Sequence, residues 1–258
     1  MSALSFDNVT AGYGARKVLT NVTAQFPTGQ VTGLVGPNGA GKTSLLRVAL
    51  GFLKPEAGRV TVLDKPLKDW SAEALARNIA YLPQSAEAHW PILGRTLVAL
   101  GRMPHRAPMA PFSAEDDAAI DAALARCDAA QFAVRRMDEL SAGERARVLF
   151  ARALATAAPI LLADEPAAYL DPAHQLRLME LLRGEAKRGV AVAVTLHDLS
   201  LASRFCDRLV VLDGGRVAGA GTPGEALSDA VLKDTFGISA VRLQGSAIIP
   251  WERLQDSP

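Results

Sequence analysis

The chain begins with two segments in which apolar and polar residues alternate. Residues 4–9 and 18–26 follow this period of two, which predicts strands with one buried face. Residues 31–35 form a further strand-like run, and residues 160–163 are apolar throughout, which is typical of a strand buried on both faces of a parallel sheet. The pattern also predicts strands at 59–63, 79–82, 190–196 and 209–212, and helices at 44–50, 71–78, 113–127, 172–188 and 199–206, with another helix starting near residue 145.

The character of the chain changes between residues 85 and 135. Prolines recur there, and an alanine-rich helical stretch follows Ser113, which forms a plausible capping box with Asp116. We therefore predict one domain over residues 1–258, an α/β core with a helical subdomain inserted at about 85–155. Residues 220–258 form a C-terminal extension, with a helix pair and a final hairpin that turns near residues 244–246.

Composition narrows the class of protein. Apolar residues make up 49% of 258, and 28 basic residues against 27 acidic ones leave a net charge of +1, which gives no electrostatic footprint for nucleic acid. Cys127 and Cys206 lack metal-ligand spacing and are expected to be small buried hydrophobes in a reducing compartment. The first eight residues lack a signal-peptide pattern, and no stretch is apolar for long enough to cross a bilayer. We expect a cytosolic chain, or one held at a membrane by a partner.

A glycine-rich turn lies between the strand at 31–35 and the helix at 44–50. Glycines let the backbone curl so that its N–H groups point inward, and the helix N-terminus adds a partial positive charge. Lys42 would reach the outer phosphates of a nucleotide, and the Thr43 hydroxyl would hold Mg²⁺. The turn reads Gly36, Pro37, Asn38, Gly39, Ala40, Gly41, Lys42, Thr43, which is the Walker A pattern G-x-x-x-x-G-K-[ST].

Two carboxylates follow the buried strand at 160–163. Acids at the carboxyl end of such a strand are costly unless they bind a metal or do chemistry. Asp164 is placed to hold a magnesium-bound water, and Glu165 to act as the general base toward the attacking water. His197 follows another strand at the same predicted edge, although a lone histidine there is more often structural. Tyr13, between two glycines, could stack on a base or be an ordinary exposed tyrosine.

The stretch Leu140-Ser141-Ala142-Gly143-Glu144 precedes the helix expected near residue 145. A small hydroxyl-bearing turn at a helix N-terminus is a second anion site. One chain does not need two such sites for one nucleotide, whereas two chains packed head to tail do.

With these motifs in this order, the chain resembles the ATP-binding subunits of ABC transporters over nearly its whole length. The resemblance implies an α/β phosphate-loop NTPase core, with a mixed sheet, an antiparallel N-terminal β-subdomain and the inserted helical subdomain. The resemblance implies ATP and Mg²⁺ as cofactors and a homodimer that binds a many-helix permease at the cytoplasmic face of the membrane, with a substrate-binding protein as an indirect partner. It implies adenine stacking at Tyr13, phosphate contacts along Gly36–Thr43 and Ser44, contact of Gln84 with Mg²⁺ and water, and a γ-phosphate histidine at His197. It also implies that Ser141 to Glu144 contact the nucleotide of the opposite protomer, and that Leu170-Asp171 belong to a loop crossing the interface.

Two departures from the family pattern affect the expected site. Ala142 stands where the family usually has glycine, which would cost about 1 kcal/mol if that position needs a positive φ. The interface loop at 167–171 lacks the small hydroxyl often found there. Neither change removes a catalytic group, so an active site is expected.

Two other classes stay open at this point. A soluble ABC-type ATPase of DNA repair, chromosome organisation or translation would lack a membrane partner, but such proteins carry coiled coils, zinc modules or a second ATPase half, which this sequence does not show. An ordinary kinase or GTPase would leave residues 140–144 unexplained. The segments 100–105, 170–175 and 196–202 resemble importers of iron–siderophore complexes, haem and cobalamin, with the surface between Gln84 and Asp128 gripping the permease. The competing interpretation is that Arg102 and His105 simply solvate a loop.

Overall fold

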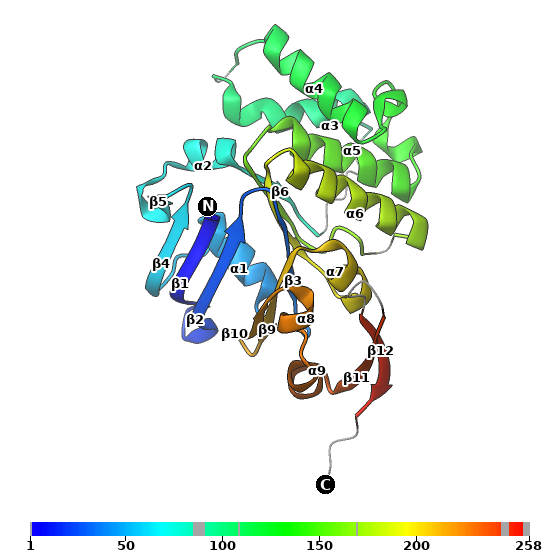
Figure 1. The fold of residues 1–258 in the computed structure, drawn as a ribbon. Coiled ribbons are helices and arrows are strands. Elements are labelled where there is room, and N and C mark those ends of the chain that lie inside the picture. Colours follow the sequence, from blue (N-terminus) through cyan, green and yellow to red (C-terminus); the bar gives the residue numbers. More distant parts are fainter. Residues whose placement is uncertain (1, 85–90, 108, 169, 244–247, 255–258) are drawn as a thin grey trace.

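A computed structural model describes residues 2–84, 91–107, 109–168, 170–243 and 248–254, and it contains two large sheets (Figure 1). The N-terminal sheet is antiparallel, because apolar–polar alternation lets one face turn to the core and the other to water. Its strand order is β2-β1-β4-β5, with β1 Ser2–Tyr13, β2 Arg16–Pro27, β4 Ala57–Val62 and β5 Lys65–Pro66.

The central sheet has the order β10-β9-β3-β8-β7-β6. Every pair in it is parallel except the edge strand β10, which runs antiparallel to β9. The strands are β3 Val31–Val35, β6 Ile79–Leu82, β7 Ile160–Ala163, β8 Ala191–Thr195, β9 Arg208–Asp213 and β10 Arg216–Gly221. Because β3, β8, β7 and β6 are parallel neighbours, their carboxyl ends meet at one edge, and that edge carries the predicted motifs.

Helix α1 (Lys42–Ala49) lies between the two sheets (Figure 1). One hydrophobic cluster joins them, with Phe6 of the N-terminal sheet, Leu45 of α1 and Leu162 of β7 all buried in it. The packing on both sides holds α1, and with it the start of the helix, in a fixed place against the central sheet.

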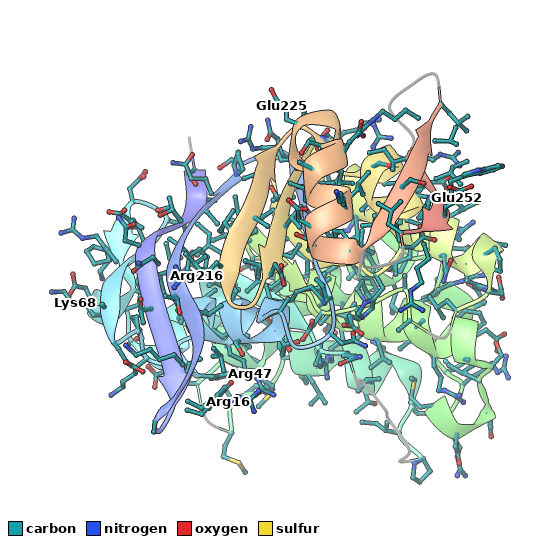
Figure 2. All side chains as sticks on the ribbon, turned by 90° about the horizontal axis from the view of Figure 1, so that it is seen from below. Arg16, Arg47, Lys68, Arg216, Glu225 and Glu252 are labelled. Carbon is teal, nitrogen blue, oxygen red and sulfur yellow. The ribbon has the colours of Figure 1, made fainter. Side chains whose placement is uncertain are left out.

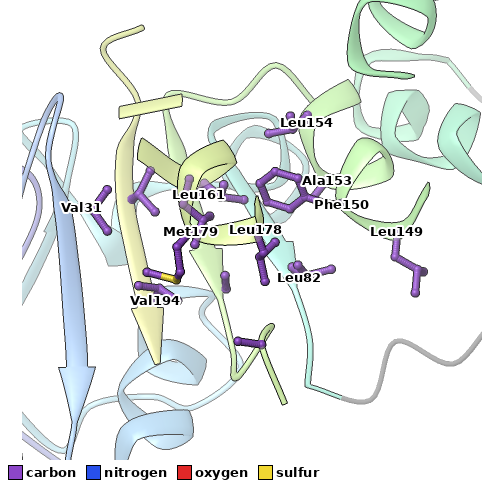
Figure 3. Close-up of a cluster of buried hydrophobic side chains, with 14 of the residues drawn as sticks. Val31, Leu82, Leu149, Phe150, Ala153, Leu154, Leu161, Leu178, Met179 and Val194 are labelled. Carbon is purple, nitrogen blue, oxygen red and sulfur yellow. The ribbon is translucent and has the colours of Figure 1, made fainter. Parts of the chain in front are cut away.

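The other face of the central sheet is covered by helices α6 (Pro172–Lys187), α7 (Leu199–Phe205) and α5 (Ala142–Ala155). Figure 3 shows Met179 of α6 lying beside Val194 of β8, and Phe150 and Leu154 of α5 near Leu161 of β7. Apolar residues on both faces bury the central strands completely, as the run at 160–163 predicts.

Three helices form the inserted helical subdomain. They are α3 (Gly94–Ala99), α4 (Ala114–Arg126) and α5, which pack on one another beside the core (Figure 1). The predicted capping box of α4 is present, with Ser113 and Asp116 satisfying each other's backbone N–H groups. The fold class is thus confirmed, while the bounds at 85 and 155 stay a prediction.

The remaining elements connect these layers or close the chain. They are α2 (Ala72–Asn78), α8 (Pro223–Ala226), α9 (Asp229–Phe236), the hairpin strands β11 (Ile238–Arg242) and β12 (Ile248–Arg253), and the 3-10 turns Leu67–Asp69, Leu100–His105, Ala130–Phe132 and Met137–Glu139. Residues 244–246, where the final hairpin was expected to turn, lie outside the described residues.

The structure contradicts the interpretation that Arg102 solvates a loop. This side chain is only 4% exposed. Its Nε donates to Asp116 Oδ1 over 2.8 Å, and its Nη1 donates to the carbonyl of Ala155 over 3.0 Å. Arg102 therefore connects the turn at Leu100–His105 to the start of α4 and to the end of α5. His105 Nε2 lies 2.8 Å from the carbonyl of Thr156, so it too contacts the chain itself.

Both cysteines are buried and free, as expected, and burial raises the pKa of each thiol to about 12. Within the described ranges, no helix combines the length and the apolar character needed to cross a bilayer.

Candidate functional site

The phosphate loop joins the carboxyl end of β3 to the start of α1. Gly36 has φ 149°, and a Cβ added there would lie 2.1 Å from the carbonyl oxygen of Leu212, so only glycine fits. Gly41 precedes α1, whose first turn has no side-chain cap and no acidic residue. A helix start without a side-chain cap can offer its N–H groups to a bound phosphate.

Lys42 lies at the first position of α1 and is 6% exposed. Its ammonium donates to the carbonyls of Gly36 over 2.8 Å and Pro37 over 3.2 Å. Burial lowers the pKa of Lys42, while the nearby carboxylates of Glu165 and Asp164 act in the opposite direction. This ammonium therefore rests on the loop itself, within electrostatic reach of the acids at the end of β7.

Strand order brings three other predicted residues together. Gln84 follows β6, Glu165 follows β7 and His197 follows β8, and these three strands are neighbours. Gln84 Nε2 donates to Glu165 Oε2 over 2.5 Å, and His197 Nε2 lies 2.5 Å from Glu165 Oε1. One carboxylate is thus held between an amide and an imidazole, beside the phosphate loop.

Asp164 is buried next to this group. Its Oδ1 accepts a hydrogen bond from the Thr195 hydroxyl over 2.8 Å, and the same hydroxyl accepts from the Glu165 N–H over 2.5 Å. Burial and the Asp164 charge raise the pKa of Tyr81 to about 12, which keeps that phenol neutral at physiological pH.

Sequence reasoning did not single out Thr195 or Tyr81. The available signal was a hydroxyl at the end of the otherwise apolar strand β8, because a buried hydroxyl requires a partner. Tyr81 could have been noticed because it lies in β6, three residues before the predicted site residue Gln84.

Tyr13 lies at the end of β1 and is 46% exposed. Its hydroxyl accepts a hydrogen bond from Arg47 of α1 over 3.1 Å, and this bond lowers the pKa of Tyr13. Figure 2 shows Arg47 at the same edge of the molecule as Arg16, the strand partner of Tyr13. An exposed aromatic ring therefore lies beside the helix that follows the phosphate loop, where a base could stack on it.

The stretch at 140–144 forms the start of α5. Ser141 and Glu144 make a capping box, in which the Ser141 N–H donates to Glu144 Oε2 over 2.8 Å and the Glu144 N–H donates to Ser141 Oγ over 3.4 Å. The Ser141 N–H lowers the pKa of Glu144. Ala142 is the first helical residue and has an ordinary negative φ, so the cost expected for alanine there does not arise.

The His174 side chain approaches the backbone of Gly143 too closely for any larger residue at that position. A Cβ at this position would lie 2.5 Å from His174 Nε2, while His174 Nδ1 lies 2.6 Å from Asp171. The start of α5 is thus packed against the start of α6, next to the predicted interface loop, of which residue 169 lies outside the described residues.

The two helix starts that are predicted to bind anions belong to different helices. Helix α1 lies between the two sheets, whereas α5 lies on the other face of the central sheet and packs with α3 and α4 (Figure 1). The N–H and the hydroxyl oxygen of Ser141 both bond to Glu144, within the cap of α5.

Comparison with known proteins agrees with this geometry. A family model described as ABC transporter matches residues 19–168, more than half of the chain. The hemin import ATP-binding protein HmuV of Pseudomonas putida is 43% identical over 88% of this chain and 90% of its own length. The cobalamin import ATP-binding protein BtuD of Halobacterium salinarum is 44% identical over 85% of this chain and 55% of its own length.

Solved structures share the fold. The ADP conformation of MJ1267, an ATP-binding cassette of an ABC transporter, superposes with a TM-score of 0.81, at 25% identity, over 91% of this chain and 96% of its own. A chain described as an inward-facing metal-chelate type ABC transporter gives a TM-score of 0.84, at 24% identity, over 98% of this chain and 99% of its own. The chain belongs to the ABC transporter family, as an ATP-hydrolysing subunit that drives transport.

Proposed function

We propose that this chain powers an importer of a metal chelate or a related macrocycle, namely an iron–siderophore complex, haem or cobalamin. The observation that carries the proposal is the Glu165 carboxylate, which Gln84 and His197 hold beside the phosphate loop. That arrangement suits hydrolysis of ATP. The import direction and the cargo class are supported by the names of the relatives, which are hemin and cobalamin import proteins.

Each residue at the strand edge has a role in this proposal. Lys42 and the N–H groups of the loop neutralise the phosphates, and Thr43, Asp164 and Gln84 would hold Mg²⁺. When bound, Mg²⁺ supplies positive charge to the β- and γ-phosphate oxygens. Glu165 takes the proton of the attacking water, and His197 donates to the γ-phosphate. Gln84 contacts one oxygen of this carboxylate and His197 contacts the other, so both neighbours orient the base.

We infer that the working unit is a homodimer. The start of α5 at Ser141 is a second predicted anion site, on a different helix from the phosphate loop that precedes α1. Two chains packed head to tail would place Ser141 to Glu144 against the nucleotide of the partner. Glu144 brings a negative charge to that end of the helix, and its capping bonds to Ser141 must adjust when a phosphate arrives.

The permease surface is proposed near the helical subdomain. Side chains there are apolar yet exposed: Leu100 and Met103 on the turn before α4, and Phe52, which is 73% exposed, after α1. Helix α2 packs against that turn, so the two segments lie at one face of the molecule. Exposed apolar side chains of this kind favour contact with a helix of a membrane protein. The chain would then sit at the cytoplasmic side of the membrane through its permease, with a substrate-binding protein on the other side.

The test is uptake in a deletion strain. Removing the gene should impair uptake of at least one of haem, a ferric siderophore and cobalamin, and the wild-type gene should restore it. A Glu165→Gln gene, expressed at the same level, should not. Normal uptake of all three compounds in a strain without a redundant ATPase would refute the cargo class, while leaving the ATPase assignment to be judged from hydrolysis by the protein itself.

A further inference from the structure

The Thr195 hydroxyl connects two neighbouring acidic residues. Thr195 ends β8, is 0% exposed, and lies within 2.8 Å of Asp164 Oδ1 and 2.5 Å of the Glu165 nitrogen. An ionised carboxylate can only accept a hydrogen bond and an amide N–H can only donate one. The single hydroxyl proton must therefore point to Asp164, which leaves an oxygen lone pair for the Glu165 N–H. Both bonds are satisfied by one atom, and only a hydroxyl can make both.

The backbone at Glu165 needs such a restraint. Its φ is 47°, in the left-handed region that a residue with a side chain seldom adopts. The direction of the side chain follows from the backbone, so the bond from the Glu165 N–H to Thr195 also aims the carboxylate between Gln84 and His197. His197 lies two residues beyond Thr195, so the same strand end contacts Glu165 twice, once through its amide and once through its carboxylate.

We propose that Thr195 is a positioning residue for hydrolysis: its hydroxyl fixes the Asp164 carboxylate and the strained Glu165 backbone to the end of β8. The inference rests on the roles proposed above for Asp164 and Glu165. It adds that β8, the strand that His197 follows, also sets the direction of the Glu165 carboxylate. The Thr195 hydroxyl, rather than the bulk of its side chain, is the group that sets this direction.

The chain contains a matched control in the adjacent strand. Thr32 of β3 pairs with Ala193 of β8, is also 0% exposed, and its hydroxyl has no hydrogen-bond partner among the described residues. The change of threonine to valine keeps the branched shape and removes the hydroxyl at both positions. At Thr32 it removes no hydrogen bond, so it measures what the substitution does to the sheet alone.

The experiment compares Thr195→Val, Thr195→Ser and Thr32→Val in the full chain, with ATPase kinetics at saturating Mg²⁺ and binding of a fluorescent ATP analogue. Thr195→Val should lower kcat by about ten- to a hundredfold, the usual effect of losing a group that orients a metal-site carboxylate. The affinity for the analogue should stay within about twofold, because the phosphate loop is untouched. Thr195→Ser should recover most of the lost kcat, and Thr32→Val should behave as the wild type.

Hydrogen exchange provides a second measurement without nucleotide. The Glu165 amide should exchange faster in Thr195→Val than in the wild type or in Thr32→Val, because its acceptor is gone. The proposal is overturned if Thr195→Val keeps its kcat, if Thr195→Ser is as impaired as Thr195→Val, or if Thr32→Val loses as much activity. Glu165→Gln separates the two levels of failure: normal turnover in Glu165→Gln overturns the site itself, whereas an inactive Glu165→Gln beside an active Thr195→Val overturns only the role of Thr195.

Discussion

Arg102 offers a quantitative test of how the helical subdomain is held together. Its side chain and that of Asp116 are 5% and 7% exposed, and their charged atoms lie 2.8 Å apart. Changing Arg102 to Met keeps an unbranched apolar stem but removes the charge. The Asp116 carboxylate then loses its cationic partner, and the carbonyl of Ala155 loses a donor.

The size of the effect follows from these contacts. Breaking a buried ion pair by removing one partner typically costs 3–5 kcal/mol. Asp116 keeps two bonds from Ser113, at 3.0 Å from the backbone N–H and 2.9 Å from the hydroxyl, which partly satisfy the remaining charge. We therefore expect Arg102→Met to lower the free energy of unfolding by about 3 kcal/mol, the lower end of that range. For a chain of this size that corresponds to a fall in Tm of roughly 6–12 °C.

The assay is urea unfolding followed by circular dichroism, with thermal unfolding alongside. Arg136→Met is the matched control, because Arg136 also pairs with an aspartate, Asp138, but the two side chains are 49% and 39% exposed. An exposed pair contributes less than about 1 kcal/mol. A loss below about 1 kcal/mol in Arg102→Met, or an equal loss in Arg136→Met, would refute the view that burial of the pair is what stabilises the subdomain.

Four further outcomes are expected. Glu165→Gln should bind ATP but hydrolyse it at least about a hundredfold more slowly and accumulate as an ATP-bound dimer, and near-normal phosphate release would contradict the role of the base. Ser141→Arg should abolish hydrolysis while the monomer still binds ATP, and mixing it with Lys42→Ala should restore at most one working site per heterodimer; full activity of a monomer at high dilution would disprove the composite site. Ala142→Gly should not raise ATPase activity and should lower the unfolding free energy by at most about 1 kcal/mol, because the position is helical, so a gain in either would show that alanine does carry a cost there. The bonds from Ser113 and Arg102 hold the pKa of Asp116 at about 2, below its ordinary 3.8. The contribution of ionised Asp116 to the free energy of unfolding should therefore persist above pH 4 and disappear as the pH falls through 2. Urea unfolding at several pH values should show a smaller acid-dependent loss of unfolding free energy in Arg102→Met than in the wild type.

Local patterns were sufficient for most of the fold, and they also supplied the candidate site residues. The glycine-rich turn, the buried run at 160–163 and the capping box at Ser113 each depend on neighbours within a few residues, which the sequence displays directly. The predicted helix at 44–50 begins two residues earlier, at Lys42, because the phosphate loop ends at the first helical turn. The helix expected near residue 145 begins at Ala142 for a similar reason, since Ser141 is its cap.

The meeting of distant residues required the tertiary structure. Gln84, Glu165 and His197 come together because β6, β7 and β8 are adjacent, and periodicity along one strand says nothing about which strand lies beside it. The sequence also offered no means to tell the Thr195 hydroxyl from that of Thr32, since both stand in apolar strands. Among the described residues, only the Thr195 hydroxyl has hydrogen-bond partners. Arg102 is the clearest case, because arginine is a residue type that usually lies on a solvated surface. It is buried here because the carboxylate of Asp116 and the carbonyl of Ala155, from two other elements, both accept hydrogen bonds from it.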